Sequence, residues 1–314
     1  MSIGANSQWP DLPFEAWRDT CETLILWTQI VGKLRIACTP LINHWWNATF
    51  DVTSRGLLAP AIPYRGRTFD MMFDFAEHRL RIVASDGRAE ALALEPMTVA
   101  DFYAAVMAAL RRLDIDVPIW TTPSEIEGAI PFEQDRVHKQ YDRVYVERFW
   151  RALVQANRVF TEFRARFIGK VSPVHFFWGG LDLAVTRFSG RTAPPLKGET
   201  PNVAKWVMDE AYSHEVSSCG FWPGNGGYGR AAFYVYAYPE PAGYGATRLK
   251  TAEAAYDNNL GQFILPYDAV RQARDADALL LGFLQETYEA AADLAKWDRK
   301  ALERQPVSAP KKSC

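Results

Sequence analysis

The sequence lacks an excess of charge of either sign. Its 314 residues include 35 Lys and Arg and 37 Asp and Glu, so the formal net charge is −2, and no stretch before the last few residues concentrates one sign. A nucleic-acid-binding protein usually needs a basic surface, because the neutralisation of phosphates supplies most of its affinity. We therefore expect no nucleic-acid partner.

Long apolar runs are also missing. No uninterrupted run approaches the roughly 18 apolar residues of a membrane-spanning helix, so we expect no membrane partner. The beginning of the chain contains Pro10, Asp11 and Pro13, where a secretory signal would have a basic segment followed by an apolar one. The expected location is therefore the cytoplasm.

Cysteine is scarce. Cys21, Cys38, Cys219 and Cys314 form no CxxC pair, which argues against a structural zinc site and against a disulfide framework. Cys219 precedes a glycine-rich stretch and could be a nucleophile, although a buried inert thiol is the commoner case.

Apolar residues are abundant, at 48% of the chain, and their spacing predicts secondary structure. The length exceeds what one core usually spans, which favours two domains or two repeats. Three- and four-residue spacing predicts helices over residues 15–33, 98–113, 145–168 and 275–294. Alternation predicts strands near residues 46–53, 68–75, 79–85, 89–94, 212–218, 231–238 and 262–265, and from residue 175 onward.

The order of these elements indicates an α+β protein built by tandem duplication of a unit of helix, four-stranded antiparallel sheet and helix. We predict a first repeat over residues 1–113, a linker over 114–142, a second repeat over 143–304 and a disordered tail over 305–314.

Short matches between the halves support the duplication. The triplet His44-Trp45-Trp46 matches His175-Phe176-Phe177, and Asp51 and Asp182 each follow their histidine by seven residues. Duplicated units often pack about a pseudo-twofold axis, so matching residues could meet in a shared cavity. Two copies can equally lie side by side with separate faces.

Four segments are long enough to be specific: NHWW at residues 43–46, SPVHFFWG at 172–179, AYSHEVSS at 211–218 and GFWPG at 220–224. Together they resemble the bacterial family known as domain of unknown function 5996, over about residues 9–304. The resemblance implies no activity, cofactor or catalytic residue.

Histidine supplies the first candidate chemistry. His175 opens a strand of aromatic residues and could be a general base or a metal ligand, or else a core imidazole bonded to a backbone carbonyl. His44, His175 and His214, with one carboxylate, could hold a divalent metal such as zinc or iron. Their spacing does not match HExxH or any closed cluster.

His214 and Glu215 are adjacent on a predicted strand, so their side chains point to opposite faces. If His214 faces a pocket with His175, Tyr212 joins them in a cluster suited to proton transfer. If Glu215 faces the pocket, two serines accompany it. Alternatively, these polar side chains bond one another within a buried strand.

The mid-strand acids Asp51 and Asp182 are disfavoured unless exposed or paired. We expect an exposed strand face, or an ion pair of Asp182 with Arg187 or Arg164, rather than catalysis. Strict alternation puts His175 and Asp182 on opposite faces, and a bulge at 179–180 would reverse that.

Aromatic residues supply candidate pocket walls. Residues 220–229 combine glycines with Phe221 and Trp222, and this stretch is either a ligand-flanking loop or a long hairpin connection. In the run 233–238, alternation places Tyr234, Tyr236 and Tyr238 on one face.

These features predict a small-molecule enzyme that uses acid–base His and Tyr groups, with a divalent metal as an option, in an aromatic-lined pocket near the repeat interface. The catalytic candidates are His175, His214, Glu215 and Tyr212; the substrate-binding candidates are Trp178, Trp222, Phe221 and Tyr236; the metal-binding candidates are His44, His175 and His214. The alternative is a non-catalytic small-molecule-binding or protein-interaction module, whose aromatic surfaces serve packing and homo-oligomer contacts.

Overall fold

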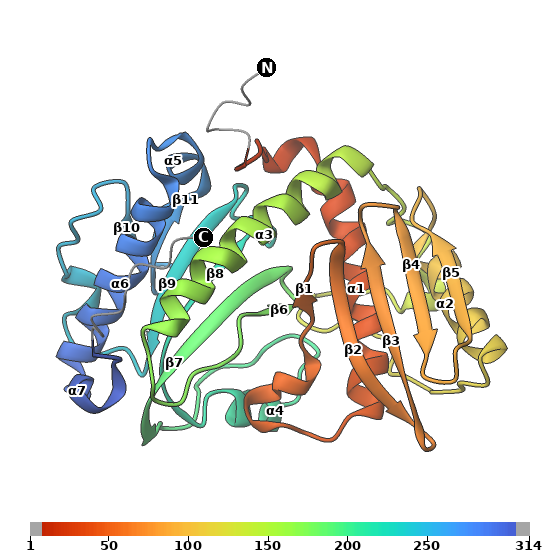
Figure 1. Cartoon of the computed structure of the whole chain (residues 1–314), viewed down its shortest axis with the longest axis horizontal. Coiled ribbons are helices and arrows are strands. Elements are labelled where there is room, and N and C mark those ends of the chain that lie inside the picture. The colour runs from red at the N-terminus through yellow and green to blue at the C-terminus, as the bar shows by residue number, and fades with distance from the viewer. Residues whose placement is uncertain (1–7, 306–314) are drawn as a thin grey trace, which may run out of the picture.

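Two antiparallel sheets form the centre of the protein in this computed structural model, which describes residues 8–305 (Figure 1). The first sheet has the order β1-β2-β3-β4-β5, with β1 Asp51–Val52, β2 Gly56–Tyr64, β3 Arg67–Asp74, β4 Arg79–Ala84 and β5 Ala89–Ala93. The second has the order β10-β11-β9-β8-β7-β6, with β6 His175–Phe177, β7 Asp182–Thr192, β8 His214–Trp222, β9 Ala232–Tyr238, β10 Ala255–Asp257 and β11 Gln262–Pro266. The predicted α+β class is confirmed, but the sheets have five and six strands rather than four.

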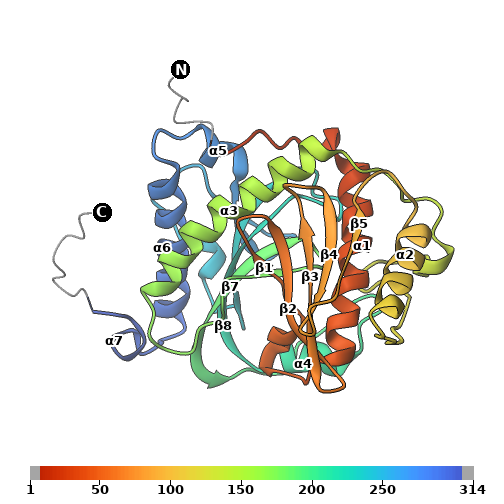
Figure 2. The same cartoon turned by 45° about the vertical axis from the view of Figure 1, so that its right-hand side comes forward.

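Helices cover one face of each sheet (Figures 1 and 2). The helices α1 and α2 pack against the first sheet, and α3 and α6 pack against the second. Their bounds are α1 Arg18–Cys38, α2 Val99–Arg112, α3 Arg143–Ala165, α4 Lys205–Ala211, α5 Tyr267–Gln272, α6 Ala276–Leu294 and α7 Arg299–Leu302, and the short 3-10 helices are η2 Phe14–Ala16, η3 Asn43–Ala48, η4 Phe132–Gln134 and η5 Tyr244–Ala246. Within residues 8–305, no helix combines the length and the apolarity of a membrane span.

Local sequence explains where several helices begin. Thr98 caps α2, because its hydroxyl accepts a hydrogen bond from the Asp101 N–H at 3.1 Å. Asp142 and Asp275 cap α3 and α6 in the same way. The helix starts predicted at residues 98 and 275 are therefore confirmed to within a residue, whereas α3 begins two residues earlier than predicted.

Strand β9 follows the predicted alternation. Phe233 and Val235 are buried in the main core, where Phe233 packs edge-on to Phe160 of α3 at 6.2 Å between ring centroids. Tyr234 and Tyr236 point to the opposite face of the sheet, because successive side chains of a strand alternate. The second sheet therefore has an apolar face under α3 and α6 and a face that carries phenols.

The segment predicted as a strand over residues 46–53 begins inside the 3-10 helix η3, which includes its first three residues. His44 and Trp45, just before it, adopt the left-handed region, with φ of 57° and 61°, so the chain turns immediately before the predicted strand. Only two residues of the segment form β1, and strand β2 was not predicted.

The two sheets meet at their edges. Phe50, just before β1, and Phe176 in β6 exchange backbone hydrogen bonds of 2.9 and 2.8 Å. The residues matched between the two halves in the sequence do not occupy equivalent positions in the two sheets. Asp51 lies in the first strand of its sheet, whereas Asp182 opens the second strand of the other. His44 likewise lies in η3, before its sheet, whereas His175 opens β6.

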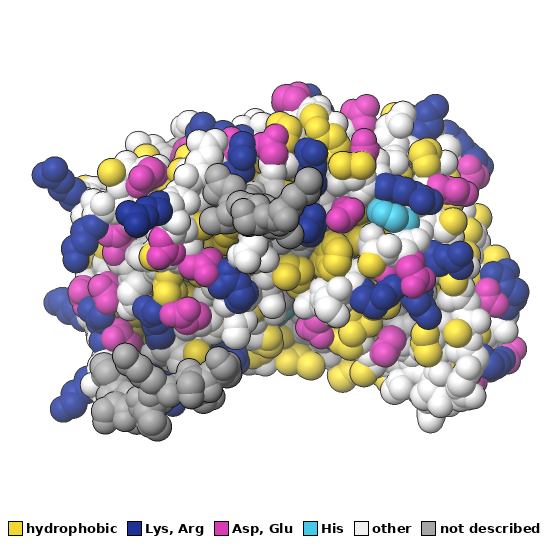
Figure 3. Space-filling view, turned by 45° about the horizontal axis from the view of Figure 1, so that its top comes forward, with side chains coloured by type: hydrophobic (Ala, Val, Ile, Leu, Met, Phe, Trp, Pro, Cys, Tyr) yellow, Lys and Arg dark blue, Asp and Glu magenta, His cyan; other side chains and the backbone are white. Residues whose placement is uncertain are grey.

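The surface shows no large field of one charge on the face drawn in Figure 3, where acidic and basic side chains are interspersed. The predicted linker, residues 114–142, has η4 as its only regular element and packs Phe132 into the core. Of the predicted tail, only residue 305 falls within the described residues.

Gly32 in α1 makes room for Trp178, and we predict that this contact supports the junction of the halves. A Cβ on Gly32 would overlap the Trp178 ring, whose Nε1 donates to the Ala48 carbonyl at 2.7 Å. Gly32→Ala should lower the free energy of unfolding by about 1–3 kcal/mol, the usual cost of overpacking. This free energy is measured by urea denaturation.

Gly282 provides the matched control. It also lies in a helix, α6, but a Cβ there would meet nothing within 4 Å. Gly282→Ala should raise the free energy of unfolding by about 0.5–1 kcal/mol, because glycine weakens helices. Equal effects at the two positions would contradict the packing argument.

Candidate functional site

A cavity of about 700 Å³ lies on the phenol-bearing face of the second sheet. We call it the central cavity, because both halves of the chain line it. Strands β6 to β9 form its floor. Its walls come from the end of α1, from η3, from residues 118–125 and from residues 200–212, which include α4.

The walls are largely aromatic. Trp45, Trp46, Trp120, Phe177, Trp178 and Phe188 all line the central cavity. Trp178 and Tyr236, two of the predicted substrate-binding residues, are therefore in the cavity lining. Trp45 is fixed there by a hydrogen bond of 3.0 Å from its Nε1 to the Val207 carbonyl of α4.

Asp182 faces the central cavity and accepts a hydrogen bond of 2.6 Å from the Tyr234 hydroxyl. Gly220 makes this bond possible, since a Cβ on Gly220 would overlap the Tyr234 ring. The expected ion pair of Asp182 with Arg187 is wrong. Arg187 points to the opposite face of β7, where its guanidinium lies 3.5 Å from the centroid of Phe163.

The expected placement of His175 and Asp182 on opposite faces of the sheet is wrong as well, because of the turn between β6 and β7. His175 pairs with Ala184 and Phe177 pairs with Asp182, so His175 and Asp182 share one face of the sheet. Strict alternation along the sequence fails here, because the four residues between the strands turn the chain back.

Glu125 is the second acid of the central cavity, and it lies in a segment without the periodic spacing of a helix or a strand. Its backbone has a φ of 63°, and its N–H donates to the Pro201 carbonyl at 2.8 Å. The Glu125 carboxyl lies against Gly179, where a Cβ would overlap it. An acid in a proline-containing segment predicted as a linker was the only available hint.

Both carboxyls are harder to ionise than usual. Burial, and secondly the charge of Asp182, raises the pKa of Glu125 to about 7. Burial raises the pKa of Asp182 to about 6, although the Tyr234 hydrogen bond lowers it. The Glu125 residue is exposed because it faces the open cavity, whereas its carboxyl has many protein atoms around it. Near neutral pH the pair can therefore hold one proton, as an acid and a base together must.

The phenols next to the carboxyls stay protonated. Burial raises the pKa of Tyr234 well above its ordinary value, and the neighbouring Tyr236, together with burial, does the same to the pKa of Tyr212. The hydroxyls of Tyr212 and Tyr236 lie 3.2 Å apart. These phenols can donate and accept hydrogen bonds but are poorly matched to proton exchange at neutral pH.

His175 lies in the cavity lining as a neutral imidazole. It is 2% exposed, and its Nδ1 has no hydrogen-bond partner within residues 8–305. Burial, and secondly the charge of Arg164, lowers the pKa of His175 to about 3. The carbonyl-bonded core imidazole considered from the sequence therefore does not account for its Nδ1.

His44 is committed to structural hydrogen bonds. Its Nδ1 lies 3.2 Å from the carbonyl oxygens of Glu210 and Ala211, and its Nε2 lies 2.6 Å from Lys170 Nζ. A neutral ring that donates from Nδ1 and accepts at Nε2 satisfies all three partners. Burial, and secondly the charge of Lys170, lowers the pKa of His44 accordingly.

The predicted metal site of His44, His175 and His214 is not formed. His214 lies outside the cavity lining, with its Nδ1 3.0 Å from Ser213 Oγ, although its ring is edge-on to His44 at 5.5 Å. In the part of the chain that the structure describes, no group of three His, Cys, Asp or Glu side chains could hold a metal ion.

Three other candidates also lie outside the cavity lining. Glu215 accepts hydrogen bonds of 2.8 Å from both Ser189 and Arg191. Phe221 is fully buried on the opposite face of β8, and Trp222 packs on Tyr228 at 4.7 Å between centroids. Of the predicted catalytic residues, His175 and Tyr212 line the central cavity, whereas His214 and Glu215 do not.

Cys219 is buried on the same side of β8 as Phe221, and burial raises the pKa of its thiol to about 12. A thiol that remains protonated at neutral pH is a weak nucleophile.

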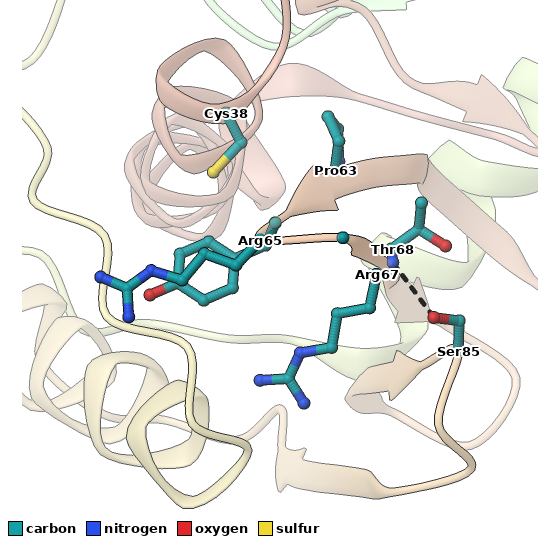
Figure 4. A pocket seen from close by; sticks show the side chains of 8 residues that line it. Cys38, Pro63, Arg65, Arg67, Thr68 and Ser85 are labelled. Atoms are coloured by element: carbon teal, nitrogen blue, oxygen red, sulfur yellow. Dashed lines mark hydrogen bonds between the residues drawn. The ribbon is translucent and has the colours of Figure 1, made fainter.

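A second hollow lies beside the hairpin between β2 and β3, lined by residues that include Cys38, Arg65, Arg67 and Ser85 (Figure 4). Its polar groups are mostly paired within the protein. Arg67 donates to Asp86 at 2.6 Å, and the Thr68 N–H donates to Ser85 Oγ at 3.1 Å. The central cavity is therefore the candidate site.

The chain belongs to the family of unknown function DUF5996, whose family model matches residues 9–304. The resemblance found in the sequence is thus confirmed. Comparison with curated proteins and comparison with solved structures gave no significant match.

We predict that both acids destabilise the folded protein as the pH rises. Their pKa values are raised from ordinary values of 4.5 for Glu125 and 3.8 for Asp182, so the folded state binds more protons than the unfolded state between about pH 4 and pH 7. Stability contributed by these groups therefore falls through that window. Glu125→Gln and Asp182→Asn should gain stability relative to the unmodified protein between about pH 5 and pH 8.

Thermal unfolding at a series of pH values measures this gain. The other titratable groups of the cavity lining, Lys33, His44, His175 and the three tyrosines, are unchanged in both variants. Glu215→Gln, outside the lining, is the control and should show no comparable gain. A stability difference that does not change with pH in either cavity variant would contradict the raised pKa values.

Proposed function

We propose that this protein is a small-molecule enzyme that uses the carboxyls of Asp182 and Glu125 as an acid–base pair in the central cavity. One observation carries the proposal: two carboxyls share an aromatic-lined cavity whose lining, among the described residues, contains no Arg and a single Lys that is hydrogen-bonded to Thr122 and Ser124. General acid–base catalysis works best with pKa values near the working pH. The values of about 7 and about 6 meet this condition.

The Tyr234 hydrogen bond divides the roles within the pair. The hydroxyl donates to Asp182 and so favours the charged form of that carboxyl. Asp182 is then the group that accepts a proton from the substrate, and Glu125 is the group that donates one. This assignment replaces the His and Tyr groups of the sequence hypothesis, because the pKa of His175 is about 3 and the phenols stay protonated.

The other lining residues suit binding rather than proton transfer. The tryptophan walls offer flat apolar surface and limit the water around the reacting groups. The Tyr212 and Tyr236 hydroxyls can bond a polar group of the substrate. His175 lies on the same side of the sheet, and its Nδ1 is buried without a hydrogen-bond partner among the described residues.

Part of the backbone strain lies at the same place. Four of the ten described non-glycine residues with positive φ, His44, Trp45, Glu125 and Asn202, line the central cavity. Such conformations cost of order 1–3 kcal/mol each and often occur at functional sites. Strain at Glu125 supports the proposal, since it fixes the position of the second acid.

We also propose that the two halves arose by duplication and that the cavity lies near their interface for that reason. The support is the order of elements, helix then antiparallel sheet then helix in each half, and the meeting of β1 and β6 through Phe50 and Phe176. A non-catalytic binding protein remains the alternative function, and it differs in leaving its ligand unchanged.

An unbiased turnover experiment tests the enzymatic function. The protein is incubated with an extract of small metabolites, and mass spectrometry follows which compounds disappear and which appear. We expect at least one conversion that falls about 100-fold or more in Asp182→Asn and in Glu125→Gln, the lower range for loss of a general acid or base. Glu215→Gln should retain it.

Two outcomes would overturn the enzymatic function. No compound is converted across a range of pH values, or a conversion proceeds equally well in both carboxyl variants. Depletion of a free compound without any product, reversed by unfolding the protein, would instead support the binding alternative.

A further inference from the structure

We propose that the central cavity recognises an organic cation, a small molecule with a protonated amine attached to a flat apolar body. This inference names the substrate class for the proposed function and rests on it. The cavity places two carboxyls without counter-charge beside phenol oxygens and tryptophan faces, and this combination of groups complements an ammonium group.

The first argument for a cationic ligand is the charge of the residues that line the cavity. Within residues 8–305, the cavity lining contains one Lys and no Arg. Lys33 Nζ donates to the Thr122 carbonyl at 2.9 Å and to Ser124 Oγ at 3.1 Å, and it lies 4.6 Å from the centroid of Trp120. Lys33 is thus held in the wall by Thr122 and Ser124 and forms no ion pair with either carboxyl among the described residues. The acids keep an unmet preference for a cation.

A metal ion does not fit this preference. Zinc usually needs three protein ligands or more, and the described residues offer no group of three. A primary ammonium needs three hydrogen-bond acceptors instead. Asp182 and Tyr236 on the floor of the cavity, and Glu125 and Tyr212 on its walls, provide acceptor oxygens for it.

The second argument for a cationic ligand with an apolar body is the aromatic lining of the cavity. A cation near the face of a tryptophan is attracted by the negative face of the ring, and Trp46 and Trp178 both line the cavity. The same rings offer contact area for a flat apolar body. The ligand therefore needs charge at one end and apolar surface at the other.

His175 places an unpartnered polar atom close to the cavity, within the described residues. Its side chain is almost completely buried, it lines the cavity, and its Nδ1 has no partner among the described residues. Buried polar atoms are rarely left without a hydrogen bond. The Nδ1 atom of His175 is itself almost inaccessible to solvent, so the recognition of the ligand described above does not depend on it.

Three naphthalene probes of nearly equal shape test the charge preference: naphthylmethylamine, naphthylmethanol and naphthoate. Quenching of tryptophan fluorescence and isothermal titration calorimetry give their dissociation constants at about pH 7.5. We expect the amine to bind about tenfold or more tightly than the alcohol, because hydrogen bonds between charged groups are the stronger ones. Naphthoate should bind weakest, because its negative charge is repelled by the carboxylates of the cavity. Asp182→Asn and Glu125→Gln should each reduce this preference, and Glu215→Gln should keep it.

Proton release provides a second readout. A bound ammonium favours ionised carboxyls, so its binding should release protons and its affinity should rise as the pH increases from about 5.5 to 7.5. The alcohol should show neither effect. Calorimetry in buffers with different ionisation enthalpies measures the number of protons released.

Equal binding of amine and alcohol, no binding of the amine up to its solubility limit, or an amine preference that persists in the double variant Asp182→Asn/Glu125→Gln would each overturn the cation proposal. These failures are distinct from failure of the enzymatic function. Turnover that depends on both carboxyls without an amine preference would keep the enzyme and remove the cation. An amine preference without turnover would keep the cation proposal and remove the enzymatic function.

Discussion

The central constraint in this protein is electrostatic: Asp182 and Glu125 face one cavity, and no cation among residues 8–305 neutralises either. Desolvation disfavours the charge on each carboxyl, and a charge on one disfavours a charge on the other. The hydrogen bond of 2.6 Å from Tyr234 offsets part of this cost for Asp182 alone. The pair is therefore asymmetric, and the aromatic walls increase the asymmetry because they cannot solvate a charge. The proposed chemistry and the proposed ligand both follow from this arrangement.

Close approach, rather than unusual backbone geometry, explains three of the glycines near the cavity. Gly179, Gly220 and Gly32 all have ordinary negative φ values or extended backbone, and each lies where a Cβ would overlap a neighbouring side chain. Gly179 leaves space for the Glu125 carboxyl, and Gly220 leaves space for Tyr234. The phenol can then cross from β9 over β8 to reach β7. The positions of both carboxyls therefore depend on the space left by glycine at positions 179 and 220.

The sequence predicted the parts of the fold that follow local rules and missed those that depend on contacts between distant segments. Capped helices and the alternation in β9 were predictable, because the determining residues are neighbours along the chain. Glu125 was not, since it lies in a segment without periodicity and its position depends on Pro201. The histidines were predicted as functional residues because imidazole can act as a base or as a metal ligand. The hydrogen bonds that give His44 a structural role come from Lys170 and α4, which are distant in the sequence. The face of Asp182 was misjudged because alternation was counted through a turn.

The location of the cavity follows from the polarity of one sheet face. The helices α3 and α6 cover the apolar face of the second sheet, which leaves a face that carries Asp182, Thr186, Ser218, Tyr234 and Tyr236. A tightly packed apolar cover would strip these groups of hydrogen bonds at a cost of about 1–3 kcal/mol for each group left unsatisfied. The end of α1, η3 and residues 118–125 instead bridge over this face and leave space above it. Because these bridging segments come from the other half of the chain, Glu125 reaches the cavity from outside the sheet, and neither half contains the acid pair by itself.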